Sequence, residues 1–261
     1  MSNEVIKDYE EYKAQGRIWG GVPPESIKQI KLPRIAKKVI DEFLALEDLT
    51  GSISDVLDTL GINGAIPASH LMPLLPTSKI AGTAITLRSI PERKTVTKGL
   101  MDKDYIRMAT RDTHYLAEPG DILVADFGGN LEVSNMGGQS VAVAQSRGVV
   151  GAIVNGAVRD VPSFRKRNFP AWCRGTTPIT GKCRMQAVEI NGPVTVFDTL
   201  VEPGDLIVAD DSGVCVIPAN KVDYVLEKCK SIIKEEETMR ELIDKEVPIS
   251  ELIPLYRKRY S

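Results

Sequence analysis

The feature that most constrains the fold of this chain is the stretch GVVGAIVNGAVRD at residues 148–160. Its apolar run, Val149–Val154, is typical of a buried strand, and an adjacent arginine and aspartate, Arg159 and Asp160, follow where that strand ends. Open α/β sheets bind their ligands beyond the carboxyl ends of the strands. The pair is therefore a candidate functional site, although adjacent charges on a protein surface more often form a solvated ion pair of little energetic value.

A helix is predicted directly before this strand. The sequence MGGQSVAVAQSRG, residues 136–148, places Gly137 and Gly138 at the start of the helix and another glycine at its end. Backbone N–H groups at a helix N-terminus are unpaired and carry the positive end of the helix dipole, so they suit a small carboxylate or phosphate. In a strand–helix–strand arrangement, this helix end opens on the same edge of the sheet as Arg159.

A short repeat indicates two further strands. EPGDILVADFGG (118–129) and EPGDLIVADDSG (202–213) each combine a Pro-Gly turn with an apolar strand that ends in an acid. Asp121 and Asp205 are expected to make hydrogen bonds within the turns. Asp126 and Asp210, at the strand ends, are candidates to face the same pocket as Arg159.

Helical patterns flank this central region. Residues 35–48 and 219–244 repeat their apolar side chains at helical spacing. Ser54 is a candidate N-cap for a short helix that ends at Gly61, and residues 97–117 are predicted to be mainly helical.

These patterns predict a chain of class α/β. Strands and helices alternate in the middle of the sequence, and strands cluster late. We expect one α/β domain, residues 35–218, with a central mixed sheet or a sheet sandwich. An N-terminal extension, residues 1–34, precedes it, and a C-terminal helix and tail, residues 219–261, follow it.

Composition excludes several classes of function. The net charge of −2 gives no basic field for nucleic acid, and no apolar run approaches the ~18–20 residues that span a bilayer. Four cysteines without a C-x-x-C pattern favour a reducing compartment, the cytoplasm, and argue against disulfides or structural zinc. With two histidines, neither a histidine-rich metal site nor a Ser-His-Asp triad is well supported.

The predicted site suits one kind of chemistry. A carboxylate beside an anion-binding helix end would repel an anionic ligand, and a hard divalent cation, Mg²⁺ or Mn²⁺, resolves that conflict by accepting oxygen ligands from both. Arg159 could then hold a carboxylate or a developing oxyanion. Such a site fits reactions of 2-oxo acids in which breaking a C–C bond leaves the enolate of pyruvate.

The sequence also resembles a known family. The pattern G-x-x-G-x-x-x-x-G-x-V-R-D, followed by F-P-x-W-x-R-G and P-G-D-x-x-x-A-D-x-x-G-V-x-V-I-P, is similar to the family that contains 4-hydroxy-4-methyl-2-oxoglutarate aldolase and the regulator of ribonuclease E activity, protein A (the RraA-like family). The resemblance runs from about Ile53 to Pro218. It implies a swivelling-type α/β/β fold and a homotrimer or homohexamer with active sites between subunits.

The resemblance also implies roles for individual residues. Asp160 would bind the divalent metal, and Arg159 would contact the substrate and the leaving oxyanion. The loop at Gln139 and Ser140, with Gly137 and Gly138 before it, would receive the pyruvyl carboxylate.

Two further side chains are candidates, the first from the resemblance and the second from its position in the sequence. A glutamate on the C-terminal helix of a neighbouring subunit, Glu236 or else Glu235, would hold the metal through water. Arg174, in the WCRG sequence, is a further candidate for substrate binding, set against a structural ion pair.

One position departs from the pattern. Aldolases of this family carry an acid where this chain has Gly138, and the loss of one negative charge should weaken metal binding or change the route of the proton. Glu132 and Asn135 are candidates to compensate.

The sequence leaves two main functions open. The first is a metal-dependent, class II-type pyruvate aldolase that cleaves a 4-hydroxy-2-oxo acid and decarboxylates oxaloacetate as a side reaction. The second is a non-catalytic regulator of a ribonuclease, or a family member with an altered substrate, which the glycine at 138 favours. A phosphohistidine domain is disfavoured, because neither His70 nor His114 lies in a Gly/Thr-rich turn. A methyltransferase role gains no support, because no G-x-G-x-x-G loop is present.

Overall fold

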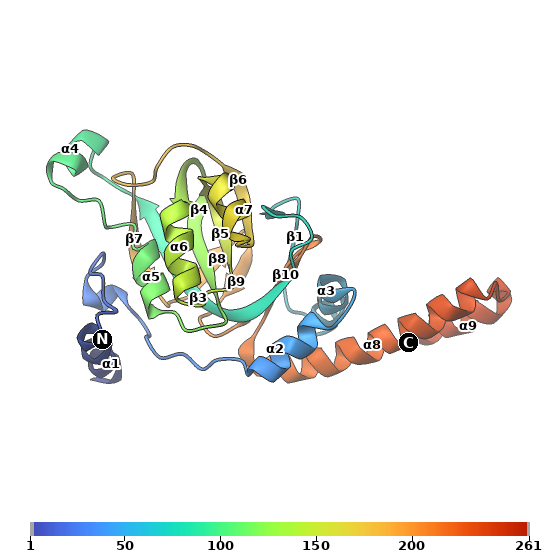
Figure 1. Cartoon of the computed structure of the whole chain (residues 1–261). Coiled ribbons are helices and arrows are strands. Elements are labelled where there is room, and N and C mark those ends of the chain that lie inside the picture. Colours follow the sequence, from blue (N-terminus) through green and yellow to red (C-terminus); the bar gives the residue numbers. More distant parts are fainter. Residues whose placement is uncertain (1–2, 260–261) are drawn as a thin grey trace.

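The centre of the protein is a mixed sheet of nine strands, described here from a computed structural model (Figure 1). The structure describes residues 3–259, with side chains to residue 255. The strand order is β1-β11-β10-β3-β4-β5-β6-β2, and β7 pairs with β3. The strands span Ala65–Pro67 (β1), Met72–Pro73 (β2), Ile80–Pro91 (β3), Asp121–Met136 (β4), Gly151–Val158 (β5), Ala171–Thr176 (β6), Met185–Ile190 (β7), Leu206–Asp210 (β10) and Gly213–Ile217 (β11), and a separate hairpin pairs Val194–Val196 (β8) with Thr199–Val201 (β9).

The helices lie at both ends of the chain and between the central strands. Neighbours among β3, β4, β5 and β6 are parallel, so helices connect them, whereas the pairs β1–β11, β10–β11, β10–β3, β3–β7 and β2–β6 are antiparallel. The helices span Asn3–Ala14 (α1), Lys37–Leu44 (α2), Leu49–Thr59 (α3), Val96–Met101 (α4), Thr110–Leu116 (α5), Gly138–Ser146 (α6), Val161–Arg167 (α7), Val222–Asp244 (α8) and Ile249–Arg259 (α9), with short 3₁₀ turns at Pro24–Ser26 and Ala219–Lys221.

The two faces of the sheet are covered differently. Alternate residues of a strand point to opposite faces. Leu123 and Val154 pack against α6 and α7 on one face, which we call the helical face. Val124, Ile153 and Trp172 pack against the β8–β9 hairpin on the other, the hairpin face. The sheet is thus covered on both sides, as the apolar run before Arg159 predicts.

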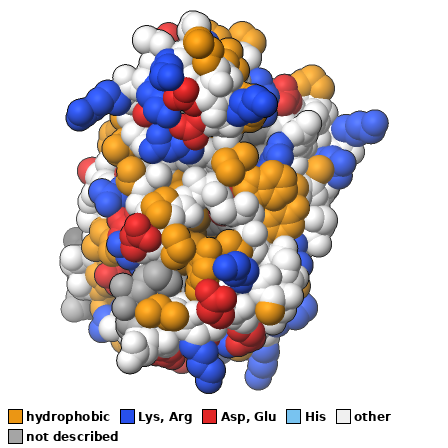
Figure 2. Space-filling view, turned by 90° about the vertical axis from the view of Figure 1, so that its left-hand side faces the viewer, with side chains coloured by type: hydrophobic (Ala, Val, Ile, Leu, Met, Phe, Trp, Pro, Cys, Tyr) orange, Lys and Arg blue, Asp and Glu red, His pale blue; other side chains and the backbone are white. Residues whose placement is uncertain are grey.

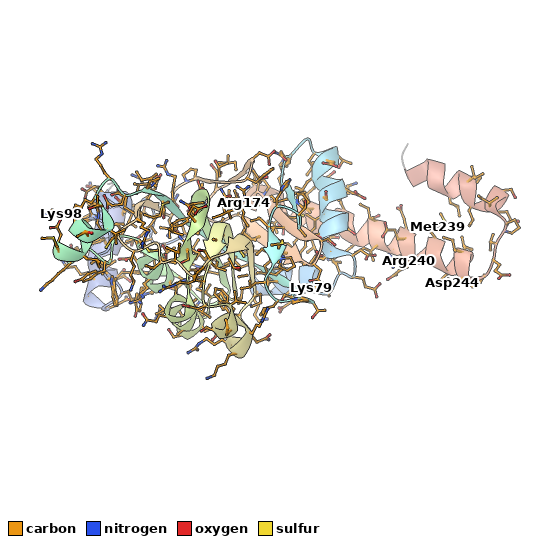
Figure 3. All side chains as sticks on the ribbon, turned by 90° about the horizontal axis from the view of Figure 1, so that it is seen from above. Lys79, Lys98, Arg174, Met239, Arg240 and Asp244 are labelled. Carbon is orange, nitrogen blue, oxygen red and sulfur yellow. The ribbon has the colours of Figure 1, made fainter. Side chains whose placement is uncertain are left out.

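A third core lies at the end of the sheet that carries β10 and β11. There α2, α3 and α8 pack together with residues of β10 and β11. Each helix contributes a fully buried side chain, namely Phe43, Ile53 and Val225. Beyond this contact α8 continues away from the body and α9 follows it, so the two form an arm (Figures 1 and 3).

The predicted helices are present, with different limits. Helix α6 covers the predicted stretch after the two glycines, and α8 lies within 219–244. The predicted N-cap at Ser54 is wrong, because α3 begins at Leu49 and Ser54 lies inside it. The carboxylate of Asp210 instead accepts from the backbone N–H of Thr50 at 3.1 Å and from its hydroxyl at 2.7 Å. Asp210 therefore stabilises the start of a helix and does not face a pocket with Arg159.

The region predicted as helical at 97–117 is two helices with a non-helical link. Helix α4 stands out from the body, and charged side chains gather over that end of the molecule (Figure 2). Lys94 and Lys98 both pair with Asp102, at 3.1 and 2.8 Å.

The two acids predicted to make hydrogen bonds within the Pro-Gly turns do so. Asp121 accepts from the backbone N–H of Glu118 at 2.8 Å, and Asp205 accepts from that of Glu202 at 2.9 Å. The four cysteines are free and buried. Across the described residues, no helix combines the length and apolar character needed to cross a membrane.

Candidate functional site

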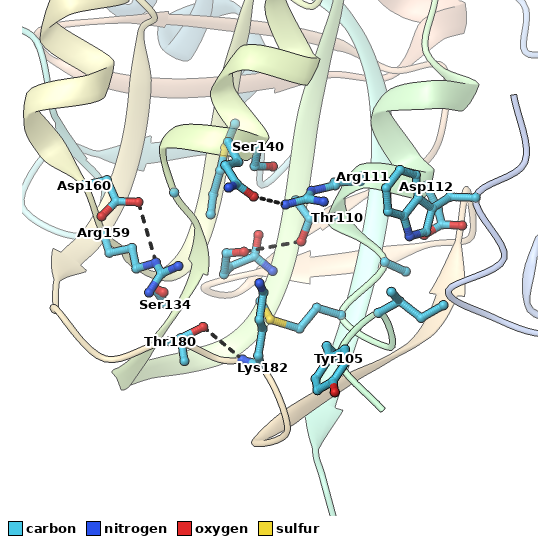
Figure 4. Close-up of a pocket in the computed structure, with 18 residues that line it drawn as sticks. Tyr105, Thr110, Arg111, Asp112, Ser134, Ser140, Arg159, Asp160, Thr180 and Lys182 are labelled. Atoms are coloured by element: carbon cyan, nitrogen blue, oxygen red, sulfur yellow. Dashed lines mark hydrogen bonds and ion pairs between the residues drawn. The ribbon is translucent and has the colours of Figure 1, made fainter. Parts of the chain in front are cut away.

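A pocket of about 390 Å³ lies on the helical face, at the carboxyl ends of β4 and β5 (Figure 4). It is lined by the end of β4, the start of α6 and the residues that follow β5, together with α5 and the loop at Thr180 and Lys182. Arg159, Asp160, Gly137, Gln139 and Ser140 are all in its wall. The structure thus brings together most of the residues that the sequence groups into one site.

The Arg-Asp pair is placed by the end of β5. The backbone N–H of Arg159 donates to the carbonyl of Met136 at 2.9 Å, which ties the exit of β5 to the end of β4. Asp160 has φ 56°, in the left-handed region that a non-glycine residue adopts at a cost. The guanidinium Nε of Arg159 lies 3.6 Å from Asp160 Oδ2, and the two side chains remain 33% and 46% exposed. Both are therefore close to each other and accessible from the pocket.

The N-terminus of α6 meets the carboxylate. Asp160 Oδ2 accepts from the backbone N–H of Gly138 at 2.9 Å. A Cβ at Gly137 would lie 2.7 Å from that oxygen and 3.0 Å from Cγ of Arg159. Position 137 must therefore be glycine for the pair to lie where it does.

A side chain at position 138 would meet a different neighbour, Ser163. A Cβ there would lie 2.6 Å from the hydroxyl oxygen of Ser163 and 3.0 Å from its Cβ. Ser163 belongs to α7, which follows Asp160 directly. In this chain the space in which an acid at 138 would begin is occupied by Ser163.

Asn135 supplies polar atoms to the pocket. Its side chain is 3% exposed, and neither its Nδ2 nor its Oδ1 has a hydrogen-bond partner in the protein. Leaving buried polar atoms unpaired costs about 1–3 kcal/mol each, so their presence in a pocket wall indicates a ligand or water there. Glu132, the other candidate to compensate for Gly138, is exposed and is not among the lining residues.

The N-terminal segment forms the opposite wall. The backbone N–H groups of Gly20 and Gly21 donate to Asp112 Oδ1 at 2.9 and 3.0 Å, and burial raises the pKa of that carboxyl. These bonds hold Trp19 at the rim, where its ring stacks on Tyr115 with 5.9 Å between centroids.

Two further cations line the pocket, and sequence reasoning missed both. The guanidinium of Arg111 lies 5.4 Å from the centre of the Trp19 ring and donates to Gln139. Lys182 is exposed at the edge. With Arg159 they give the pocket three cationic side chains, which suits an anionic ligand. Neither residue lies in a recognisable motif, so only the fold brings them to the site.

Ser140 is tied to a buried histidine behind the pocket. Its hydroxyl lies 3.1 Å from Nε2 of His114, and that ring is fully buried. Burial lowers the pKa of His114 from 6.5 to about 3. The ring is therefore neutral at physiological pH.

This histidine makes stability depend on pH. Because its pKa is lower in the folded than in the unfolded state, the unfolded chain binds the extra proton. Its full contribution is present above pH 6.5 and falls toward pH 3, by about 1.4 kcal/mol per pH unit. In urea unfolding across that range, the difference in unfolding free energy between the parent protein and His114→Gln should change with this slope, whereas His70→Gln should track the parent protein. An equal slope in His114→Gln would contradict the prediction.

Four predicted residues lie elsewhere. Arg174 and Asp126 line a different hollow, on the hairpin face. Glu236 lies on α8, where it pairs with Arg240 at 3.3 Å, and Glu235 is next to it. Within one chain neither glutamate lines the pocket. The role predicted for them involves a neighbouring subunit, so it stays a prediction.

The donor set of the pocket suits a hard cation that keeps most of its water. Among the described residues, no group of three or more His, Cys, Asp or Glu side chains is placed to hold a metal ion. Asp160 and Asn135 both line the pocket, and the Oδ1 of Asn135 is buried without a partner in the protein. Mg²⁺ is commonly held by one or two carboxylates together with water and substrate oxygens, so this set fits it.

Comparison with known proteins identifies the family to which this chain is similar. A family model described as RraA-like, Aldolase/RraA, matches residues 50–216. The Legionella pneumophila protein DlpA is 29% identical over 246 residues, which are 93% of this chain and 37% of DlpA, so the chain spans little more than a third of that relative.

Two other relatives match over most of their length. A protein of Halalkalibacterium halodurans that is provisionally named 4-hydroxy-4-methyl-2-oxoglutarate aldolase is 32% identical over 198 residues, 76% of this chain and 86% of that protein. The crystal structure of Streptomyces coelicolor RraAS2, described as an unusual member of the RNase ES inhibitor RraA protein family, superposes with a TM-score of 0.68 at 26% identity, covering 80% of this chain and 99% of that one. The match to the family model spans all but the last residue of the sheet, every pocket residue except Trp19, and the Arg159–Asp160 pair, and on it the chain belongs to the aldolase/RraA family.

Proposed function

We propose that the protein is a lyase that uses Mg²⁺ or Mn²⁺ to break a C–C bond of a 4-hydroxy-2-oxo acid and release pyruvate, with oxaloacetate decarboxylation as a side reaction. The observation that carries this proposal is the Arg159–Asp160 pair in the wall of one cationic pocket, where the Gly138 N–H at the start of α6 holds the Asp160 carboxylate. The aldolase name of the Halalkalibacterium halodurans relative supports it.

In this proposal the acidic and amide side chains bind the metal, and the cationic side chain binds the substrate. Asp160, with the amide oxygen of Asn135, would hold the metal. When bound, the cation would polarise the 2-oxo group of the substrate. Arg159 faces the same space with a planar guanidinium, whose N–H groups match a carboxylate or an enolate oxygen. As the C–C bond breaks, its electron pair passes to the pyruvyl fragment, and the fixed charge of Arg159 stabilises the oxygen that becomes negative.

The two reactions differ in their need for a base. Aldol cleavage must remove the proton of the 4-hydroxyl group, whereas oxaloacetate loses CO₂ without that step. The missing acid at Gly138 therefore bears on the aldolase reaction more than on decarboxylation. Oxaloacetate is for this reason the better first substrate.

The test is the release of pyruvate from oxaloacetate, with Mg²⁺ or Mn²⁺ and again after EDTA. The metal also decarboxylates oxaloacetate in solution, so each rate is corrected with metal alone. We expect activity that EDTA removes and that Asp160→Ala loses. Asp58→Ala, at an exposed acid of α3, is the matched control. Activity that survives in EDTA or in Asp160→Ala would reject the proposal.

The proposed enzyme is a homotrimer or homohexamer. The arm of α8 and α9 projects from the body, which suits a contact with a neighbouring copy (Figure 3). Glu236 or Glu235 of that copy would then reach the pocket. Light scattering measures the mass, and a monomer would contradict this part of the proposal.

A second function is favoured by one observation. Ser163 occupies the space next to Gly138, so the acid of the aldolases has no simple replacement here. We infer as the alternative a non-catalytic regulator that binds a ribonuclease, in line with the description of the Streptomyces coelicolor relative. Inhibition of purified ribonuclease E by the protein, with no turnover of oxaloacetate, would favour this alternative. Turnover without inhibition would dispose of it.

A further inference from the structure

A second hollow, of about 420 Å³, lies on the hairpin face of the sheet. Asp126 of β4, Asn155 of β5 and Arg174 of β6 form its floor, and the tip of the β8–β9 hairpin, Phe197 and Asp198, forms its rim. Its residues are separate from those that line the first pocket. The function proposed above uses none of them.

Asn155 points to a missing hydrogen-bond donor. The residue is 6% exposed. Its side-chain Nδ2 donates to Asp126 Oδ1 at 3.1 Å and to the carbonyl of Thr195 at 3.2 Å. Reversing the amide would face its oxygen toward these two acceptors, so the network fixes the orientation. Asn155 is one of the residues that line the hollow, and its Oδ1 atom is buried and has no partner in the protein. A ligand that satisfies it must donate a hydrogen bond.

Two carboxylates, Asp126 and Asp198, line the hollow together with Asn155. Asp126 uses Oδ1 to accept from Asn155 and from the backbone N–H of Gly128, at 2.9 Å. Asp198 is exposed at the hairpin tip, and within the described part of the chain its carboxylate forms no ion pair. Two carboxylates beside an orphaned amide oxygen make a set that an ammonium group would satisfy.

The hollow also has a cationic side chain, Arg174, which can bind an anion. Arg174 has no carboxylate partner in the described part of the chain, and its guanidinium lies 5.7 Å from the centre of the Phe197 ring. Phe197 has φ 58°, a strained conformation for an aromatic residue, and its ring stacks on His70 with 3.9 Å between centroids. A Cβ at Gly129 would lie 2.3 Å from Nη1 of Arg174, so that glycine admits the guanidinium.

We propose that this hollow binds a free amino acid in its zwitterionic form. The ammonium group donates to Asn155 Oδ1 and is neutralised by Asp126 and Asp198, and the carboxylate pairs with Arg174. A divalent metal would be opposed by Arg174, a simple carboxylate by the two acids, and a simple amine would leave Arg174 unpaired. Only a ligand with both charges meets every group.

The test begins with the common amino acids, added singly to the full-length protein and followed by thermal shift and then by calorimetry. For the one that binds tightest, its deaminated acid and its decarboxylated amine are titrated beside it. We expect binding to require both charged groups. Arg174→Met and Asp198→Asn should each weaken it by about tenfold or more, the loss expected for a charge-assisted hydrogen bond.

Asp160→Asn is the matched control, because it removes a charge from the pocket on the other face of the sheet. It should leave amino-acid binding unchanged, which makes the result independent of the proposed lyase activity. The proposal is overturned if no amino acid binds, if the deaminated acid or the amine binds as tightly, or if Asp160→Asn abolishes binding while Arg174→Met retains it.

Discussion

Replacing Arg159 by methionine is expected to lower kcat/KM for pyruvate release from oxaloacetate by about 100- to 1000-fold, the loss typical of removing one donor to a developing oxyanion. Its Nε lies 3.6 Å from Asp160, and the side chain lines the pocket with one third of its surface exposed. Methionine keeps an unbranched apolar stem and loses the charged guanidinium. The lost interaction is the one that strengthens as the enolate forms, so kcat should fall along with kcat/KM.

Arg159→Lys and Arg93→Met make this result specific. Lysine restores the charge without the planar N–H pair, so it should recover part of the rate. Arg93 is exposed, lies outside the pocket, and its removal should change nothing. Binding of oxalate, a planar mimic of the pyruvate enolate, should weaken in Arg159→Met by calorimetry. A rate within about threefold of the parent protein would remove Arg159 from the reaction, since typical effects at such sites are far larger.

The strand before Arg159 shows how much of the site the sequence reveals. Its apolar run indicates burial on both faces, and its exit places Arg159 and Asp160 beside the N-terminus of α6. All of this is local information, carried within about 25 residues of sequence. The fold class followed from the same alternation of strands and helices.

The same strands explain why Arg174 and Asp126 could not be assigned to a pocket from the sequence. Side chains alternate between the faces, so Arg174 shares the face of Trp172, and Asp126 that of Val124. A strand that is apolar on both faces has no polar side to reveal which residues point toward the helices. The two charges therefore belong to the hollow on the hairpin face.

The features of the fold and the pocket that the sequence did not predict depend on contacts between residues far apart in the chain. Thr50 and Asp210, which define the start of α3, are 160 residues apart. Trp19 and Arg111 meet at the rim of the pocket only because Asp112 binds the backbone of Gly20 and Gly21. Local spacing carries no record of such pairs, since they depend on how separate elements pack.

Replacing Gly137 by alanine is expected to lower kcat/KM for oxaloacetate by about 100-fold, the effect of moving catalytic groups by roughly 1 Å. The backbone of Gly137 has φ −150° and ψ −173°, which alanine adopts without strain. The cost comes from contact alone, because the new Cβ would lie 2.7 Å from Asp160 Oδ2 and 3.0 Å from Cγ of Arg159. Both side chains must move, which disturbs the bond from the Gly138 N–H to Asp160.

Gly51→Ala is the matched control for this substitution. Gly51 lies inside α3, and a Cβ there would meet no atom within 4 Å. Alanine at that helical position should raise the free energy of unfolding by about 0.5–1 kcal/mol and leave turnover unchanged. Gly137→Ala should instead keep the stability close to that of the parent protein, because the displaced pair is partly exposed, and lose the activity. If both alanine variants kept full activity, the position of the Arg159–Asp160 pair at the end of α6 would have no part in catalysis.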